Sequence, residues 1–367
     1  MAPPLPRRRT ERERSTNDLN RTVSPKNYPL ISRNKTGCLL SLKSLFYLLM
    51  LQRLFILATL LWGTALSAQN RELLGEYKIG IIGRDQEDAI YQAAHEGARA
   101  ATLELSRKYS IDVELVIFTP NKAQGGSQMN ALAELFIEDA DGLIISPRQS
   151  EAIRASVDFA LKQGQEVIFF ESQLTDCKPL ASVLADEGEA GRMAGRAILE
   201  KLPTKARVAI LTSKEPGSEL EQRMAGLREV LGYRRIEKTI TCEPNYQSAI
   251  EAIRTAEEND RNDLIKGWVF LEDWPLLGMP ALPWKPGELP VVAIQSSPSA
   301  FMYVDQGYLD ALVVHPYYDW GYKSVETMIE KLHNEKAPES IIVRTTPRIV
   351  DWRNAEAYRD NWKKWLK

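Results

Sequence analysis

Residues with the chemistry to bind a small polar molecule come just after the short apolar runs of this sequence. They are carboxylates, hydroxyls, amides and aromatic rings, with few cations among them: Asp88–Tyr91, Ser146, Glu171–Ser172, Arg223, Tyr246, Glu272–Asp273, Gln295 and His315. Aromatic rings offer flat apolar faces, and polar groups at fixed positions give orientation through hydrogen bonds. The residue types therefore predict a site for a small polar ligand.

These residues match no established catalytic or metal-binding pattern. The chain has neither a G-x-S-x-G elbow nor an H-E-x-x-H helix, and its cysteines form no C-x-x-C pair. The histidines and cysteines are His95, His315, His333, Cys38, Cys177 and Cys242. We therefore expect no enzyme activity, metal or cofactor. A glycosidase is the enzymatic alternative, because Asp88 with Glu171 or Glu272 offers paired carboxyl groups. A disulfide between Cys177 and Cys242 stays open.

The stretch YKIGIIGRDQEDAIYQAAHEGARAA, from Tyr77 to Ala101, begins as a dinucleotide-binding domain would. Its first apolar run carries Gly80 and Gly83 but lacks the G-x-G-x-x-G spacing that lets a backbone approach a pyrophosphate. Asp85, Glu87 and Asp88 lie in the loop that follows and would repel phosphate. The stretch therefore predicts a strand, a polar loop and a helix without a nucleotide site.

Apolar runs alternate with amphipathic segments along the rest of the chain. We predict strands over Lys78–Ile82, Val113–Phe118, Gly142–Ile145, Glu166–Phe170, Ser182–Ala185, Arg207–Leu211, Ile236–Thr241, Gly267–Leu271, Val291–Ile294 and Ala311–Val314. We predict helices over Ala89–Tyr109, Gly126–Ile137, Ser150–Gln163, Glu189–Leu202, Ser218–Leu231, Tyr246–Asn259 and Asp319–Leu332. This alternation is typical of parallel sheets covered by helices on both faces. Ten strands exceed one ordinary sheet, so we predict an α/β protein with two such domains. Ligands of such sheets bind beyond the carboxyl ends of the strands, where the polar residues lie.

The N-terminal segment reads as an export signal behind an unusual extension. Residues 50–68 contain Arg53, an apolar run and small residues at their end, which is the layout of a secretory signal peptide. A retained signal anchor is the alternative. Residues 1–49 are proline-rich and basic, so we expect either a mis-annotated start, with Met50 as the true first residue, or a disordered tail.

The charge distribution argues against nucleic-acid binding. Residues 1–49 carry ten Lys and Arg against three acidic residues, whereas the whole chain has a net charge of -2. The remainder is therefore acidic, and an acidic surface does not neutralise phosphates. A transcription regulator is disfavoured because no helix-turn-helix precedes the body and because the chain is predicted to be exported.

Several short motifs occur in a familiar order and spacing. Tyr91 is followed six residues later by Gly97, and Leu143–Pro147 reads as a strand ending in a proline turn. Three further motifs are Asp186–Ala194 (DEGEAGRMA), Arg223–Gly226 (RMAG) and Gly307–Ala311 (GYLDA). In these features residues 77–352 resemble the periplasmic sugar-binding proteins of the ribose-binding type, the type I substrate-binding proteins of ABC transporters.

The resemblance implies the fold, the domain limits and the function. It implies the type I periplasmic binding protein fold, whose two domains are joined by a three-segment hinge. The domains would be residues 77–185 with 316–344 and residues 186–315 with 345–352, followed by a C-terminal helix over 353–367. The protein would be periplasmic and would deliver a sugar, polyol or amino sugar to a membrane permease. The alternative is a sensory protein that presents its bound form to a membrane histidine kinase or receptor.

The resemblance also implies the ligand contacts. Ile90 and Tyr91 fall at positions of sugar-stacking aromatics in the first domain, and Tyr246 falls at such a position in the second. Polar contacts would come from Asp88, Ser146, Glu171, Ser172, Arg223, Glu272, Gln295 and His315. The chain departs from the family pattern in placing Glu171-Ser172 where an Asp-Arg pair is typical. Three carboxylates (Asp88, Glu171 and Glu272) against one arginine favour a ligand with an amine or several hydroxyl donors over a sugar acid.

Two segments lie outside the pattern. The stretch Trp274–Pro290 contains five prolines and is predicted to be a surface loop. Residues 351–367 carry Trp352, Tyr358, Trp362 and Trp365 and predict an amphipathic helix that packs on the body, with contact to a partner or a membrane surface as the alternative.

Overall fold

Residues 73–295 and 297–366 are described by the computed structural model. They belong to a compact unit formed by residues 71–367. The predicted extension and signal peptide lie outside the described residues. Within the described ranges, no helix combines the length and the apolar character needed to cross a bilayer.

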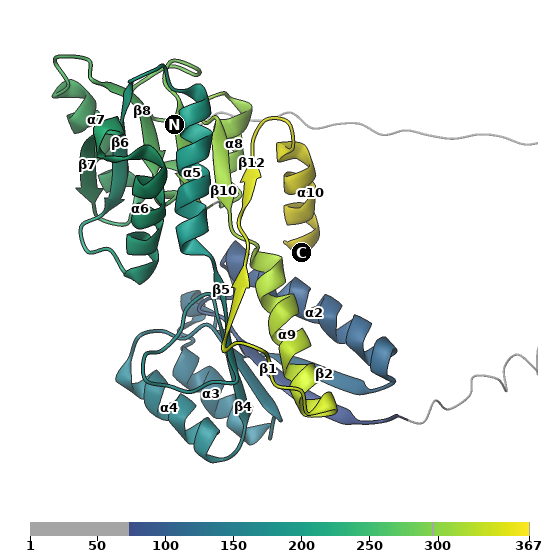
Figure 1. Cartoon of the computed structure of the whole chain (residues 1–367). Helices are drawn as coiled ribbons and strands as arrows, with labels where there is room; N and C mark the ends of the chain where they lie inside the picture. The colour runs from purple at the N-terminus through teal and green to yellow at the C-terminus, as the bar shows by residue number, and fades with distance from the viewer. Residues whose placement is uncertain (1–72, 296, 367) are drawn as a thin grey trace, which may run out of the picture. The chain divides into compact units, whose positions relative to one another are not determined.

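The first lobe is a parallel six-stranded sheet of order β11-β5-β4-β3-β1-β2 (Figure 1). Its strands are β1 (Glu76–Ile82), β2 (Asp112–Ile117), β3 (Gly142–Ile145), β4 (Glu166–Phe170), β5 (Ala181–Ala185) and β11 (Ile342–Thr345). Its helices are α2 (Ala89–Tyr109), α3 (Gln128–Ile137), α4 (Glu151–Lys162) and α9 (Tyr317–Asn334). Side chains alternate between the faces of a strand. Ile144 accordingly joins the core beneath α2 and α9, whereas Leu143 and Ile145 join the core beneath α3 and α4.

The second lobe repeats this plan with the order β12-β10-β9-β8-β6-β7. Its strands are β6 (Arg207–Ser213), β7 (Ile236–Cys242), β8 (Ile265–Phe270), β9 (Val291–Ile294), β10 (Ala311–Val314) and β12 (Arg348–Val350). Its helices are α5 (Glu187–Lys201), α6 (Ser218–Leu231), α7 (Tyr246–Glu258) and the short α8 (Ala300–Asp305). Strand β12 runs antiparallel to β10, so this sheet departs from the all-parallel prediction at one edge.

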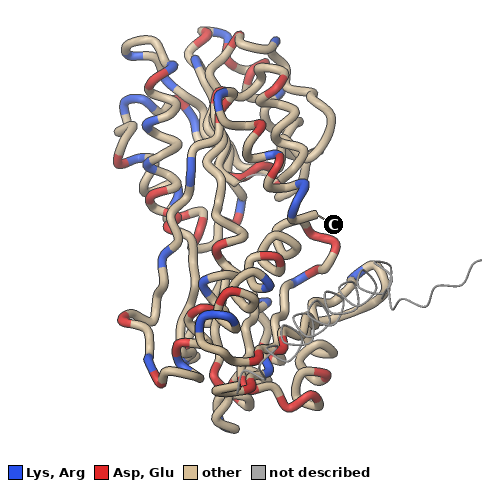
Figure 2. Tube along the Cα trace, turned by 90° about the vertical axis from the view of Figure 1, so that its right-hand side faces the viewer, with Lys and Arg blue, Asp and Glu red and all other residues tan. Residues whose placement is uncertain are grey.

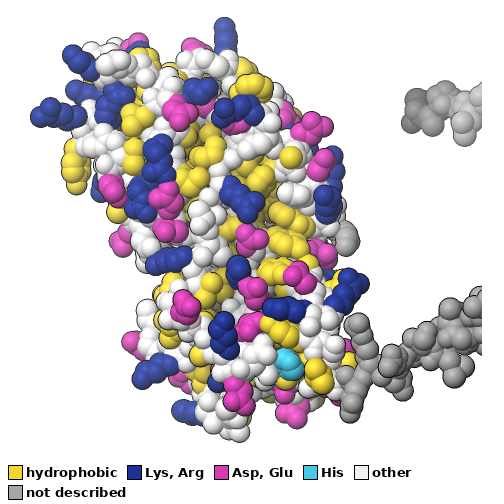
Figure 3. All heavy atoms as spheres, turned by 45° about the vertical axis from the view of Figure 1, so that its right-hand side comes forward, with side chains coloured by type: hydrophobic (Ala, Val, Ile, Leu, Met, Phe, Trp, Pro, Cys, Tyr) yellow, Lys and Arg dark blue, Asp and Glu magenta, His cyan; other side chains and the backbone are white. Residues whose placement is uncertain are grey.

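The chain passes between the two sheets three times: from β5 to α5, from β10 to α9 and from β11 to β12. The predicted fold class, two parallel-sheet α/β domains joined by a three-segment hinge, is confirmed. All ten predicted strands are present. The sequence patterns missed β11, β12 and α8. Figures 2 and 3 show acidic and basic residues interspersed over both lobes.

Close crossings between helices explain three glycines of the sequence motifs. Helices α5 and α6 pack so tightly that a Cβ atom at Gly191 would lie 2.0 Å from the carbonyl oxygen of Arg223. A Cβ at Gly226 would lie 2.0 Å from the carbonyl oxygen of Gly188. Gly97 serves the same purpose in the first lobe, where α2 crosses α9. Only glycine permits backbones to approach so closely.

The proline-rich segment is not the surface loop that its composition predicts. Leu276 and Leu282 are buried, and Trp284 is 6% exposed and stacks on Trp268 with ring centroids 5.9 Å apart. Proline rules out regular helix through much of this segment but does not prevent its side chains from packing. The segment therefore covers one end of the second core. The predicted C-terminal helix is present as α10 (Ala355–Trp365).

Candidate functional site

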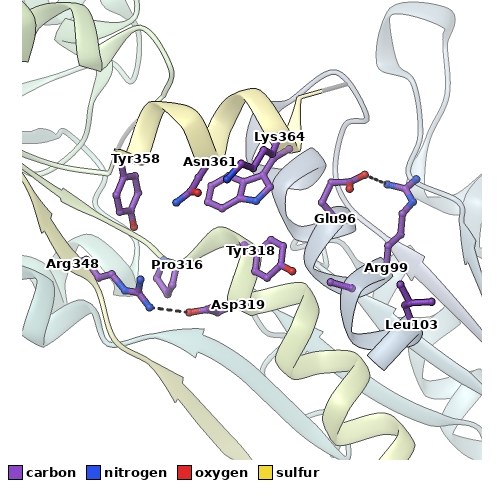
Figure 4. A pocket seen from close by; sticks show the side chains of 12 residues that line it. Glu96, Arg99, Leu103, Pro316, Tyr318, Asp319, Arg348, Tyr358, Asn361 and Lys364 are labelled. Atoms are coloured by element: carbon purple, nitrogen blue, oxygen red, sulfur yellow. Dashed lines mark hydrogen bonds and ion pairs between the residues drawn. The ribbon is translucent and has the colours of Figure 1, made fainter. Parts of the chain in front are cut away.

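A cleft of about 660 Å³ lies between the two lobes, within the usual range for small-ligand sites. Its lining includes residues that lie within two positions of the ends of β4, β8, β9 and β10: Glu171, Glu272, Gln295 and His315. A larger hollow of about 810 Å³ lies beneath α10 (Figure 4). The cleft is the candidate ligand site, because the carboxyl ends of the parallel strands of both sheets open into it.

The wall of the first lobe is organised around the carboxylate of Glu171. The Tyr91 hydroxyl donates to Glu171 Oε2 at 2.7 Å, and the Ser146 hydroxyl donates to the same oxygen. Arg84 Nη2 lies 3.5 Å from this oxygen and donates to Ser172 Oγ at 2.6 Å. Glu171 has a positive φ of 65°, a left-handed conformation that is uncommon for a residue other than glycine and often marks functional sites.

The wall of the second lobe is organised around the guanidinium of Arg223, which is 3% exposed. Its Nε donates to Glu187 Oε2 at 2.6 Å, and its Nη1 donates to Glu272 Oε1 at 2.6 Å and to the carbonyl of Leu271 at 2.8 Å. Its Nη2 lies 3.2 Å from Glu187 Oε1 and 2.9 Å from His315 Nε2. Protein partners thus satisfy this arginine, while both carboxylates line the cleft.

The two carboxylates of this wall differ in their proton affinity. Burial alone would raise the pKa of Glu187. The nearby charges of His315 and Arg223 have the larger, opposite effect, so the pKa lies well below its ordinary value of 4.5. Burial raises the pKa of Glu272 to about 7, against the opposing effect of Arg223, and the charges of Asp273 and Glu187 add to the rise. One guanidinium does not fully compensate two buried carboxylates. The pKa of the second carboxylate, Glu272, is therefore raised.

Aromatic side chains come from the hinge side of the cleft. Tyr317 and Trp320, at the start of α9, line it together with His315. The Tyr317 and Trp320 rings meet edge to face with centroids 5.1 Å apart. Both rings are almost fully buried, so they form the rigid back of the cleft rather than a projecting face.

Seven of the eleven predicted contact residues line the cleft: Ile90, Glu171, Ser172, Arg223, Glu272, Gln295 and His315. Asp88 instead caps α2, where its carboxylate accepts from the Ile90 amide at 3.0 Å. Tyr91 is 3% exposed and lies with Ser146 behind Glu171. The Tyr246 hydroxyl donates to the Met279 carbonyl, outside the cleft lining.

The residue patterns missed Arg84, Glu187, Tyr317 and Trp320, all of which line the cleft. Arg84 corrects the count of one arginine, because its guanidinium bonds to Ser172, where the sequence comparison indicated a missing arginine. Its position directly after Gly83, at the end of a predicted strand, was the available signal. Arg344 also lines the cleft, so the charges there are more balanced than the sequence suggested.

Metal and disulfide chemistry are not indicated in the described part of the chain. No group of three or more His, Cys, Asp or Glu side chains there is placed to hold a metal ion. Cys177 and Cys242 are free thiols, and the disulfide alternative is not formed.

Comparison with known proteins relates the chain to binding proteins. The family described as periplasmic binding protein domain matches residues 79–336. A D-ribose/D-allose-binding protein from Pseudomonas aeruginosa is 21% identical over 172 residues, which cover 45% of this chain and 53% of that protein. The match thus spans about half the length of this relative.

Solved structures share the fold. A periplasmic ribose ABC transporter structure from Conexibacter woesei has a TM-score of 0.67 and 20% identity, covering 81% of this chain and 100% of that one. An arabinose binding protein from Geobacillus stearothermophilus has a TM-score of 0.65 and 16% identity, covering 77% and 99%. A solute binding protein from Actinobacillus succinogenes with bound D-allose has a TM-score of 0.61 and 17% identity, covering 77% and 100%.

Proposed function

Because the chain belongs to the periplasmic binding protein domain family, a family of binding proteins rather than enzymes, we propose that it captures a sugar or sugar-like molecule and delivers it to an ABC permease. The observation that carries this proposal is the cleft, which presents Glu171 beside Arg84 on one wall and two carboxylates around Arg223 on the other. The names of the similar proteins, which include ribose, arabinose and allose binders, support the ligand class.

Binding would proceed by closure of the two domains on the ligand. The proposed domains are residues 77–185 with 316–344 and residues 186–315 with 345–352. Ligand contacts from both lobes exist together only when the cleft is closed, so a ligand that uses both walls favours the closed state. The permease would then distinguish the closed form from the open form.

The side chains of the cleft fit hydroxyl groups on a compact ligand. Glu171, Glu272 and Gln295 offer acceptor oxygens to hydroxyl hydrogens, and carboxylates accept such bonds strongly. Arg84 offers donors to ring or hydroxyl oxygens. Tyr317 and Trp320 form an apolar back that suits the C–H face of a sugar. We assign the ligand contacts to the seven predicted residues that line the cleft together with Arg84.

Export would follow from residues 50–68, which we propose to act as a cleaved signal peptide. A periplasmic location agrees with the family. N-terminal sequencing of protein recovered from the periplasm tests this step: a start near Gln69 is expected, and retention of residues 50–68 would contradict it.

Calorimetric titration of the exported protein with D-ribose, D-allose, D-arabinose and D-tagatose tests the ligand class. We expect saturable binding of at least one sugar. Arg84→Met should weaken it about tenfold to a hundredfold, the effect of losing a hydrogen bond to a charged group, about 1.5–3 kcal/mol. Arg148→Met is the matched control, because Arg148 is exposed outside the cleft lining. Absence of binding to sugars, polyols and amino sugars alike would refute the proposal.

A further inference from the structure

Helix α10 touches both lobes beside the hinge. It packs against α8 of the second lobe and against α2 of the first. In Figure 1 it lies next to β12, close to where the chain crosses between the sheets. When the lobes rotate about the hinge, the contacts of α10 with at least one lobe must change.

The first half of α10 is tied to the second lobe. Arg359 Nη2 lies 2.7 and 2.6 Å from the two carboxylate oxygens of Asp305 in α8. The Tyr358 ring packs on Phe301 of the same helix, with centroids 6.4 Å apart. The chain also enters α10 directly from β12 through a turn in which the Asp351 amide donates to the Asn354 side chain at 2.9 Å. These contacts fix the start of α10 to the second sheet.

The second half of α10 is docked on the first lobe through two tryptophans. Trp362 is 2% exposed, and its ring lies 5.7 Å from that of Tyr317. Trp365 stacks on Tyr318 with centroids 5.6 Å apart and an interplanar angle of 23°. Tyr317 is part of the ligand cleft. An aromatic path therefore leads from the cleft to α10, although α10 contributes no residue to the cleft lining.

One face of α10 borders a hollow instead of packing closely on the first lobe. The hollow of about 810 Å³ beneath it is lined by Tyr358, Asn361 and Lys364 of α10 on one side and by Tyr318 and Asp319 of α9 on the other (Figure 4). Because this space is not filled, the packing of α10 on α9 depends on Trp362 and Trp365. The helix is thus held to the second lobe by its contacts with α8 and to the first lobe by Trp362 and Trp365.

We propose that α10 is a clasp across the hinge that limits how far the lobes open, and that Trp362 is a positioning residue that holds Tyr317 at the back of the cleft. By limiting the opening, the clasp increases the fraction of ligand-free molecules whose lobes are close to their closed arrangement. Apparent affinity depends on that fraction. The effect on affinity rests on the proposed sugar-binding function, whereas the effect on lobe opening does not.

Inter-lobe distances measured by pulsed electron paramagnetic resonance, without ligand, test the clasp. Nitroxide labels are placed at Lys162→Cys in α4 and Glu251→Cys in α7, both exposed, with the native cysteines changed to alanine. Trp362→Ala and Arg359→Ala should each broaden the distance distribution. Trp362→Phe keeps a ring against Tyr317 and should restore most of the narrow distribution.

Lys363→Ala is the matched control, because Lys363 bonds to Asp360 within α10 itself and should leave the distances unchanged. If Trp362→Ala does not fold, judged by circular dichroism, Arg359→Ala alone carries the test. Distributions for the folded variants that equal that of Lys363→Ala would overturn the proposal.

Sugar affinity of the same variants supplies the second readout. Releasing the clasp should raise the dissociation constant about fivefold or more, while Lys363→Ala leaves it unchanged. Broadened distances without any sugar binding in the parent protein would uphold the clasp and reject the proposed function. Broadened distances with unchanged affinity would reject the positioning role of Trp362.

Discussion

The buried carboxylate of Glu187 gives the sharpest test of the charge network on the second wall. Replacement by glutamine removes the charge and keeps the shape. Glu187 pairs with Arg223 at 2.6 and 3.2 Å, and its Oε2 lies 3.3 Å from His315 Nε2. All three side chains are buried. The electrostatic interactions among them are therefore little screened by solvent.

The magnitude follows from these contacts. Breaking a buried ion pair from one side costs about 3–5 kcal/mol. Glutamine keeps one oxygen that accepts from Arg223, and Glu272 still pairs with the guanidinium at 2.6 Å, so we take the lower end, about 3 kcal/mol. At about 2 °C for each kcal/mol in a chain of this size, the melting temperature should fall by about 6 °C.

The stabilisation by Glu187 should depend on pH. Because the pKa of Glu187 lies below its ordinary value of 4.5 in the folded protein, its stabilisation is fully present above about pH 4.5 and is lost as the pH falls below that. The difference in melting temperature between the parent protein and Glu187→Gln should therefore shrink as the pH falls from 5 towards 3.

Thermal unfolding of the ligand-free protein, followed by calorimetry at several pH values, measures this. Glu189→Gln is the matched control, since Glu189 lies in the same first turn of α5 but pairs with Arg192 and Arg196 on the exposed side. Such exposed pairs contribute about 0–1 kcal/mol. Equal melting temperatures for the two variants, or a difference that persists unchanged to pH 3, would refute the reasoning.

Three further predictions concern single residues. Because the pKa of Glu272 is raised to about 7, the free energy of unfolding should fall by up to about 3 kcal/mol between pH 5 and pH 8; Glu272→Gln should flatten this fall in urea titrations, and an unchanged slope would contradict the assignment. Tyr91→Phe removes the hydroxyl that donates to Glu171 and should cost about 1–2 kcal/mol of stability while changing sugar affinity little; lost affinity at unchanged stability would mean direct ligand contact. Gly191→Ala should destabilise by about 2 kcal/mol or more, because its Cβ meets the backbone of α6, whereas Gly188→Ala, whose Cβ has ordinary space, should be neutral or stabilising; similar midpoints would contradict the close crossing.

The sequence alone predicted which segments form helices and strands. The limits of α2 and α6 agree with those read from the sequence, Ala89–Tyr109 and Ser218–Leu231. Helix periodicity, capping side chains and apolar runs depend on neighbours within a few residues, so they are legible without the fold. The three-residue strand β12 has no such local signal, since its place depends on the strand β10 beside it.

The site was predictable to the extent that strand ends could be recognised. Glu171, Glu272, Gln295 and His315 each follow a predicted strand, and parallel strands deliver the residues after them to one edge of the sheet. The sequence therefore indicates these residues as neighbours in a common cleft.

Only the tertiary structure decided which side chains reach the cleft and which support it. Tyr91 and Arg84 both follow β1, yet the tyrosine ring is buried beneath Glu171 and the arginine lies in the cleft. Glu187 lies in the site because it pairs with Arg223, which is 36 residues further along the chain. Side-chain direction, burial and charge pairing depend on which helices pack together across each sheet, and that packing joins residues far apart in sequence whose mutual contacts leave no local pattern.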